Sequence, residues 1–205
     1  MIEKEASFLS RCCHLNLPLL HGINVEVKPF FIATQYYGND KFEGTTLYNL
    51  LKKDPATLPP SEKWLHIITQ TADALCHLHS KDVLHNDVKT DNIVIYNNPS
   101  GFMSPILIDF GKACLLSEAK VKSLSKEERS RYRMHHKHIA PVVVDAYTVK
   151  SDVYSFAIAI CSVYSCCKIK PLKEVARHCI KPFHSRCTSS EILRILTCFE
   201  DCVEK

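Results

Sequence analysis

The sequence predicts an α+β fold in which a small first part, containing a helix and two strands, precedes a larger and mainly helical part. Three observations support this prediction. Apolar residues recur with the helical period in residues 2–13 and 61–78. Short apolar runs within 23–37, 93–96 and 106–108, separated by turn-forming residues, are typical of strands. The apolar run over 153–167 is almost continuous, which is typical of a helix buried on every side.

Length and composition are those of an ordinary globular protein. The 205 residues can build one sizeable core, and 46% of them are hydrophobic. The formal net charge of +4 is small, and no basic patch alternates with aromatic residues, so nucleic-acid binding is not expected. The sequence contains no run of about 18 apolar residues, so no membrane-spanning helix is expected. The first residues also lack the basic segment and apolar core of a signal peptide.

The eleven cysteines contain no C-x-x-C pair. The adjacent pairs Cys12-Cys13 and Cys166-Cys167 do not match the ligand spacing of a zinc site. We therefore interpret the cysteines as reduced, mostly small core residues, and expect a cytoplasmic or nuclear protein. Redox sensing is the less favoured alternative.

The individual elements follow from local patterns. Pro29 divides the apolar residues of 23–37 into two strands. Thr45 or Thr46 can cap a short helix that ends before the prolines of 55–60, and Ser61 can cap a long helix. The apolar face of this long helix carries Leu65, Ile68, Ala72, Leu75 and Leu78. Helices at 172–180 and 190–199 complete the chain, and a capping box of Thr188 and Glu191 opens the last one.

The stretch 85–111 carries the residues with the clearest chemistry. A polar loop is followed by the strand 93–96, a turn rich in Asn, Pro, Ser and Gly, and the strand 106–108. This turn folds the second strand back, so we expect Asp109 to return close to Asn92. An amide oxygen and a carboxylate brought together in this way suit Mg²⁺ that carries a phosphate ligand. Asp87 and Lys89 then lie beside the metal, as a proton acceptor and as a positive charge for a phosphoryl group.

These residues resemble the catalytic loop and metal-binding triplet of the eukaryotic protein kinases, H-R-D-x-K-x-x-N and D-F-G. The two motifs stand here as residues 85–92 and 109–111. The resemblance implies an ATP-dependent transferase in which Asp87 deprotonates the acceptor hydroxyl and Lys89 stabilises the transferring phosphoryl group. Asn92 and Asp109 would hold Mg²⁺. The position of Lys89 favours Ser/Thr over Tyr as the acceptor.

The resemblance also implies a two-lobed kinase fold, with a remnant small lobe at 1–38 and a helical catalytic lobe at 39–205. Glu5 matches the glutamate of the family's C-helix, which normally pairs with a lysine on the third strand. Gln35 and Tyr36 match the hinge that receives adenine, so they and Glu5 join Lys89, Asn92 and Asp109 as expected ATP-binding residues. Asp152 would accept hydrogen bonds from the backbone of the catalytic loop.

The chain departs from the family pattern at several places. No glycine-rich loop or lysine-bearing strand is expected, because only four residues precede Glu5. Asn86 replaces the usual arginine, and the A-P-E motif reads Ala140-Pro141-Val142. Arg186 resembles the arginine that pairs with the missing glutamate, so either Arg186 is exposed or Asp145 replaces that partner.

Three functional interpretations follow from these residues. The first is a protein kinase that transfers the γ-phosphoryl group of ATP to Ser/Thr hydroxyls of a protein substrate. The second is a catalytically impaired pseudokinase, a kinase-like binding module that docks protein partners. The third is a fragment of a longer kinase.

Overall fold

The computed structural model describes residues 2–38, 44–97, 102–119 and 148–203, and six single residues at 125, 127, 128, 130, 134 and 140. The first part contains helix α1 (Ile2–Arg11) and strands β1 (Leu20–Asn24) and β2 (Phe31–Thr34). The remainder contains β3 (Thr45–Thr46), α2 (Leu47–Leu51), α3 (Ser61–Ser80), β4 (Val83–Leu84), β5 (Ile93–Asn97), β6 (Met103–Leu107), β7 (Cys114–Leu115), α5 (Val149–Cys167), α6 (Lys170–Ile180) and α7 (Ser189–Val203). The predicted α+β class, mainly helical with a small strand-bearing first part, is confirmed.

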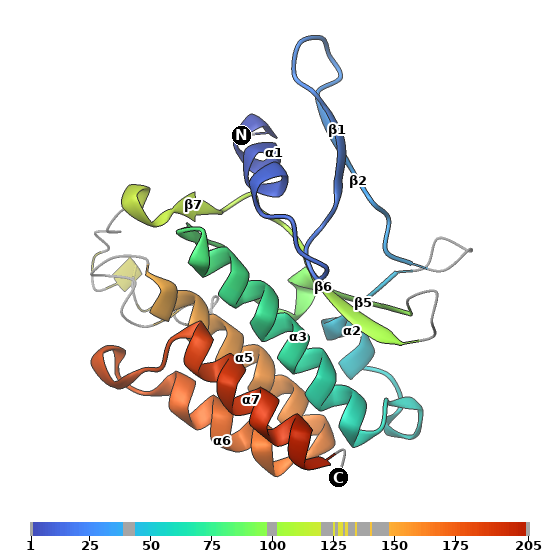
Figure 1. The fold of residues 1–205 in the computed structure, drawn as a ribbon, viewed down its shortest axis with the longest axis vertical. Helices are drawn as coiled ribbons and strands as arrows, with labels where there is room; N and C mark the ends of the chain where they lie inside the picture. Colours follow the sequence, from blue (N-terminus) through green and yellow to red (C-terminus); the bar gives the residue numbers. More distant parts are fainter. Residues whose placement is uncertain are drawn as a thin grey trace.

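The long helices form the body of the molecule. Figure 1 shows α3, α5, α6 and α7 gathered below, with α1 and the β1–β2 hairpin projecting above them. Helix α3 packs along α7, and α5 packs along α6. Val153, Phe156 and Ile160 of α5 are fully buried, as the continuous apolar run predicted. Within the described ranges, no helix has both the length and the apolar character needed to cross a membrane.

Helix starts follow the predicted caps with one exception. Thr188 and Glu191 form the predicted capping box, in which each side chain accepts a hydrogen bond from the backbone N–H of the other residue. The cap predicted at Ser61 is wrong. The N-cap of α3 is Pro60, which makes no side-chain capping bond, and Ser61 is the first helical residue. Pro60 has extended backbone angles, and its ring already fixes the dihedral with which the chain enters the helix.

A small antiparallel sheet supports the motif-bearing loop. Its strand order is β3-β5-β6, and Ile93 of β5 lies opposite Leu107 of β6. Strand β6 begins at Met103, earlier than the predicted residue 106, and includes Pro105. Pro105 is tolerated because β6 is an edge strand. The side chain of Asn16 donates a hydrogen bond to the carbonyl of Pro105 at 2.8 Å, so a loop covers this edge.

The β1–β2 hairpin contrasts with this covered sheet. The two strands pair antiparallel with one irregularity, after Leu20, and form a sheet of their own. The predicted division of 23–37 into two strands is confirmed, although β1 begins earlier and β2 ends earlier than that stretch. Several large apolar side chains of the hairpin are exposed: Ile23, Val27, Phe30 and Phe31.

Candidate active site

Asp152 anchors the polar loop that follows β4. One oxygen of its carboxylate accepts the backbone N–H of His85 at 2.7 Å, and the other accepts that of Asn86 at 2.8 Å. His79 Nε2 lies 3.2 Å from the same carboxylate. The Asp152 side chain is 1% exposed, so these contacts replace its lost hydration. The prediction that Asp152 accepts backbone hydrogen bonds from this loop is confirmed.

His85 joins the polar loop to the strand that precedes Asp109. Its Nε2 lies 3.0 Å from the carbonyl of Ile108, and its Nδ1 lies 3.3 Å from the backbone nitrogen of Asp87. Burial lowers the pKa of His85 below its ordinary value, while the charge of Asp152 acts in the opposite direction. The ring is therefore neutral at physiological pH. In this form Nε2 donates to the carbonyl and Nδ1 accepts from the backbone, as the two contacts require.

The hairpin brings Asn92 and Asp109 together, as predicted. Asn92 Nδ2 lies 2.9 Å from the carbonyl of Asp87 and 3.2 Å from its carboxylate, and 3.4 Å from Asp109 Oδ2. Asp109 has a positive φ of 70°, a conformation that is rare for a residue other than glycine. The backbone N–H of Gly111 donates to Asp109 Oδ1 at 3.2 Å. A side chain at position 111 would crowd this oxygen at the same distance, which favours glycine there.

The donor set of Asn92 and Asp109 fits a magnesium ion. The three contacts of the Asn92 amide with described residues all use its nitrogen, which leaves Oδ1 as the atom for a metal. Asp109 adds a carboxylate. Two protein oxygen ligands are few, but Mg²⁺ typically keeps several waters and takes the remaining ligands from phosphates. Among the described residues no group of three His, Cys, Asp or Glu side chains could hold a metal, so any metal held here depends on such additional ligands.

Asp87 lies between two lysines. Its carboxylate is 2% exposed, with Lys89 Nζ 3.0 Å from Oδ2 and Lys112 Nζ 2.9 Å from Oδ1. The contact with Lys89 was predicted as proximity in one site. The contact with Lys112 was missed, because it depends on the pairing of β4 with β7, which returns the segment after Gly111 to the polar loop. The only sequence signal was the place of Lys112 directly after Asp109-Phe110-Gly111.

Comparison with known proteins agrees with this geometry. The profile of the family described as protein tyrosine and serine/threonine kinase matches residues 1–195. The chain belongs to the protein kinase family. It is 29% identical over 157 residues to tyrosine protein-kinase src-1 of Caenorhabditis elegans, covering 76% of this chain and 28% of that protein. It is 27% identical over 174 residues to human receptor-interacting serine/threonine-protein kinase 1, covering 79% and 24%. It is 29% identical over 170 residues to the Raf homolog serine/threonine-protein kinase of C. elegans, covering 80% and 19%.

These kinases act on different hydroxyls, as their names state, so membership in the family does not fix the acceptor. The chain also spans less than a third of the length of each of the three. The family relation therefore shows the kinase fold class, whereas the division into two lobes and the substrate stay predictions. The acceptor residue, the cofactor and the individual roles of the site residues remain predictions.

Asn86 has a structural role in the kinase loop that the sequence did not reveal. Its backbone is left-handed, with φ of 63°, a region that Asn tolerates better than most residues. Its Nδ2 donates to the carbonyl of Lys112 at 3.1 Å and to Cys114 Sγ at 3.1 Å. The residue that replaces the family's arginine thus ties the catalytic loop to the segment after Gly111.

The predicted nucleotide-side residues lie in the first part of the chain. Glu5 is half-buried on α1, and its carboxylate forms no ion pair with any described residue. The backbone N–H of Gln35 donates to the carbonyl of Leu19 at 2.9 Å, just after β2 ends. Tyr36 is 52% exposed. The described contacts join Asp87, Lys89, Asn92 and Asp109 to one another, and none of them joins Glu5 or Gln35 to that group.

The structure excludes one of the two alternatives for Arg186. Arg186 is only 4% exposed, so the interpretation as an exposed residue is wrong. Its guanidinium donates to the carbonyls of Lys150 at 2.7 Å and Lys181 at 3.2 Å, and it lies 4.9 Å from the centre of the Tyr154 ring. Asp145, the other alternative, lies outside the described residues.

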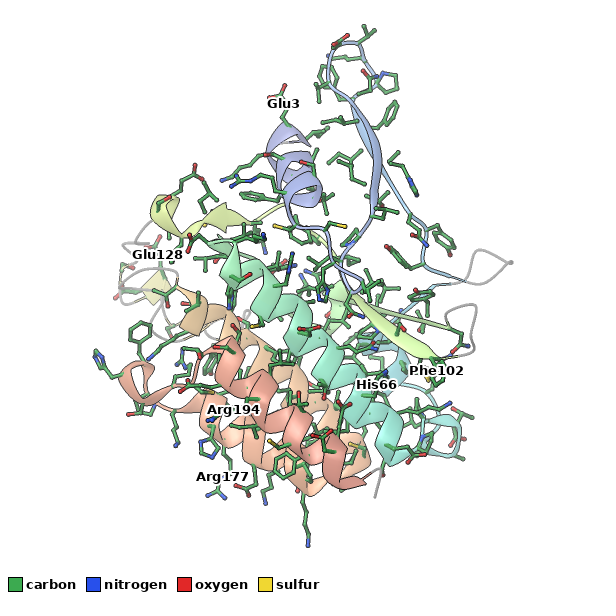
Figure 2. The ribbon with its side chains drawn as sticks, in the orientation of Figure 1. Glu3, His66, Phe102, Glu128, Arg177 and Arg194 are labelled. Atoms are coloured by element: carbon green, nitrogen blue, oxygen red, sulfur yellow. The ribbon has the colours of Figure 1, made fainter. Side chains whose placement is uncertain are left out.

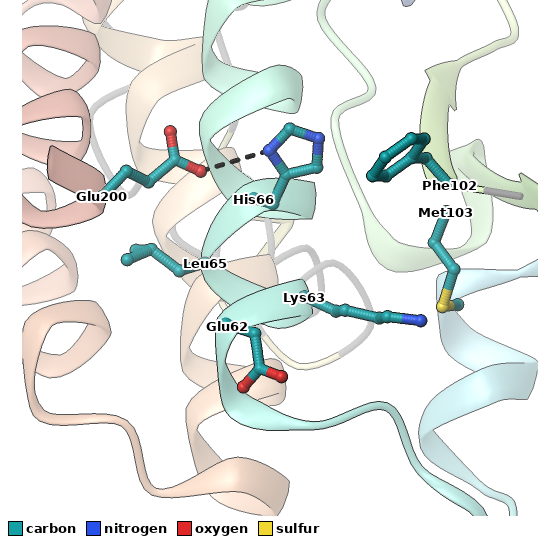
Figure 3. A pocket seen from close by; sticks show the side chains of 7 residues that line it. All are labelled: Glu62, Lys63, Leu65, His66, Phe102, Met103 and Glu200. Atoms are coloured by element: carbon teal, nitrogen blue, oxygen red, sulfur yellow. Dashed lines mark ion pairs between the residues drawn. The ribbon is translucent and has the colours of Figure 1, made fainter. Parts of the chain in front are cut away.

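A further cavity of about 280 Å³ lies away from the kinase motifs, between α3, α7 and the start of β6. Figure 3 shows its lining, in which His66 faces Glu200 across the two helices at 3.4 Å. Its wall is mostly apolar, and no residue of the catalytic loop lines it. It is therefore separate from the candidate active site.

Proposed function

We propose that this chain transfers the γ-phosphoryl group of ATP to Ser or Thr hydroxyls of a protein substrate. One observation carries the proposal. A buried carboxylate, Asp87, is held within hydrogen-bonding distance of both Lys89 and Asn92, and Asn92 in turn reaches Asp109. A base, a cation and a metal-binding pair are the parts that phosphoryl transfer requires.

Each residue has a role that its contacts support. Asn92 Oδ1 and the Asp109 carboxylate would hold Mg²⁺, which supplies charge neutralisation on the phosphates when ATP is bound. Asp87 orients the acceptor hydroxyl through Oδ1 and accepts its proton there. Lys89 remains 3.0 Å from the other oxygen, Oδ2, and provides positive charge for the transferred group. The preference for Ser/Thr rests on the position of Lys89, two residues after Asp87.

Lys112 contacts Oδ1 of Asp87, and Lys89 contacts Oδ2. The side chain of Lys112 is 57% exposed, so water can solvate its ammonium group when it moves away from the buried Asp87 carboxylate. Lys112 can therefore yield Oδ1 when a substrate approaches. We assign it a positioning role: it holds the Asp87 carboxylate in place before the substrate arrives.

A second candidate function is a kinase-like module that binds protein partners without catalysis. Three observations favour it. Glu5 lacks a cationic partner among the described residues, Asn86 replaces arginine, and the β1–β2 hairpin exposes large apolar side chains. The matched set of Asp87, Lys89, Asn92 and Asp109 favours catalysis instead.

One assay of phosphoryl transfer distinguishes the kinase from the non-catalytic binding module. We would incubate the chain with Mg²⁺, radiolabelled ATP and a peptide mixture containing Ser, Thr and Tyr acceptors, and identify the labelled residue. Asp87→Asn should lower the rate about 100-fold or more, because it removes the base. Asp91→Asn, at an exposed position in the same loop, is the matched control and should keep full activity. Labelling no greater than that of Asp87→Asn would favour the binding module, and labelling on Tyr would contradict the proposed acceptor.

A further inference from the structure

A polar cavity of about 470 Å³ lies where the start of α5 meets the loop before α7. It is lined by Lys150, His178, His184, Ser185, Arg186, Cys187, Thr188, Glu191, Arg194 and Ile195. Three of these residues, Lys150, Arg186 and Arg194, are permanent cations, whereas Glu191 is the single carboxylate. The lining thus has a net charge of two positive units when its histidines are neutral. None of the proposed catalytic residues belongs to it.

Arg186 is the buried cation of this cavity. The guanidinium donates from Nε and Nη1 to two backbone carbonyls, and the described part of the chain contains no carboxylate within ion-pair distance of it. Carbonyl oxygens are neutral, so these bonds satisfy hydrogens without balancing the charge. Burial lowers the pKa of Arg186, but an arginine remains protonated in a protein. A buried cation of this kind is stabilised by an anion.

The single carboxylate of the lining, that of Glu191, accepts hydrogen bonds from Thr188. Glu191 Oε2 accepts hydrogen bonds from the backbone N–H of Thr188 at 2.8 Å and from its hydroxyl at 3.0 Å. The pKa of Glu191 is held below its ordinary value, first by these bonds to Thr188 and then by the charges of Arg194 and Lys150. Glu191 therefore caps α7 as an ionised carboxylate, and its single negative charge balances only one of the three positive charges of the lining.

The other cations can reach an anion in the cavity. Lys150 Nζ donates to the carbonyls of Phe183 at 3.2 Å and His184 at 3.3 Å, and an ammonium has three hydrogens, so one remains for a ligand. Arg194 is exposed on the second turn of α7, and none of its five donors makes a hydrogen bond to a described residue. Figure 2 labels Arg194 on α7 and also Arg177 on α6, an arginine that does not line the cavity.

We propose that this cavity is an anion site that binds a phosphate group. A phosphate dianion matches the two positive charges of the lining, and arginine and lysine are the residues that recognise phosphate oxygens. The volume far exceeds the roughly 30 Å³ of a water molecule, so a phosphate attached to a larger group also fits. This inference does not depend on catalysis at Asp87.

The test is a titration of the full chain by isothermal calorimetry at constant ionic strength. The probes are inorganic phosphate and, separately, a phosphoserine peptide with its unphosphorylated counterpart. We expect saturable binding of phosphate that weakens about fivefold in Arg194→Gln and in Lys150→Gln, because each removes one charge. Arg177→Gln is the matched control and should bind as the wild type does. Tighter binding of inorganic phosphate would identify a free anion as the ligand, and tighter binding of the phosphopeptide would identify a phosphorylated chain.

Three results would overturn the proposal. The first is the absence of saturable binding of either phosphate probe. The second is an equal loss of affinity in Arg177→Gln and Arg194→Gln, which would indicate a general surface-charge effect. The third is binding that appears only in Asp145→Asn, which would mean that a carboxylate of the chain itself neutralises Arg186. Thermal melting of each variant shows whether a loss of binding reflects unfolding. If one of Arg194→Gln and Lys150→Gln does not fold, the other carries the test.

Discussion

The catalytic loop with its β5–β6 hairpin and the β1–β2 hairpin differ in how far the chain itself completes them. In the first region, Asp152, His85 and Asn92 each contact named partners within about 3 Å, and Phe110 is 2% exposed. In the second region, Phe30 and Phe31 are 46% and 49% exposed. An uncovered sheet with large apolar side chains is a surface for further contacts.

This difference indicates that the part of the site proposed for phosphoryl transfer is positioned by the chain itself, whereas the part proposed for nucleotide binding needs further contacts. The residues proposed to act on the phosphoryl group and the acceptor are positioned by contacts within the described chain. In the described part of the chain, no contact joins the residues proposed to hold the nucleotide, Glu5 and Gln35, to that group. The following substitutions test this contrast between a self-contained region and an incomplete one.

The largest effect is expected from the same substitution made in both regions. Phe110→Ala should destabilise the protein by about 3–5 kcal/mol, because it leaves a cavity beside His85, whose ring centre lies 5.2 Å away. Phe31→Ala, in the exposed hairpin, should cost less than about 1 kcal/mol. Urea denaturation followed by circular dichroism measures both. Equal costs would mean that the two regions do not differ in packing.

Asp152→Ala should destabilise by about 3 kcal/mol, because it leaves two backbone N–H groups without the carboxylate that accepts their hydrogen bonds. The comparison is Asp73→Ala, whose carboxylate is 52% exposed and pairs with His14 at 3.2 Å. This pair should contribute less than about 1 kcal/mol. Urea denaturation measures both variants. A small effect of Asp152→Ala would show that the loop at His85 and Asn86 does not depend on the Asp152 carboxylate.

The two lysines beside Asp87 separate a catalytic role from a positioning role. If the chain is an active kinase, Lys89→Ala should lower the rate of phosphoryl transfer about 100-fold, equivalent to about 2.7 kcal/mol. Lys112→Ala should lower it about threefold (~0.7 kcal/mol), because Lys89 still holds the Asp87 carboxylate. The measurement is kcat with a labelled peptide at saturating ATP. An equal loss in both variants would assign Lys112 a direct role.

The smallest effect concerns pH. Burial lowers the pKa of His85, so the unfolded chain binds its proton at a higher pH than the folded protein does. Below the unfolded value of about 6.5, stability should therefore fall by about 1 kcal/mol per pH unit until the folded pKa is reached. Denaturation at several pH values should show a shallower slope in His85→Gln. His21→Gln, at an exposed position of β1, should keep the wild-type slope.

Local patterns predicted the fold and the centre of the site because they depend on residues close in sequence. The turn between β5 and β6 is short, so the approach of Asn92 and Asp109 followed from spacing alone. The pairing of Lys112 with Asp87 and the burial of Arg186 could not be predicted, because each depends on elements far apart in the chain. Strand β6 extends past Pro105 because the cost of a proline depends on whether the strand is at an edge, which only the sheet order reveals.

The proposed magnesium site at Asn92 and Asp109 is tested most directly by nucleotide binding. We would measure thermal unfolding of the wild type, Asp109→Ala and the control Asp91→Asn, each with ATP in the presence and absence of Mg²⁺. At ATP about 100-fold above Kd, binding stabilises by about 2.7 kcal/mol, or roughly 5–10 °C for a chain of this size. We predict a magnesium-dependent shift in the wild type and in Asp91→Asn that is lost in Asp109→Ala. A shift of equal size in Asp109→Ala, or no shift in the wild type, would contradict the account.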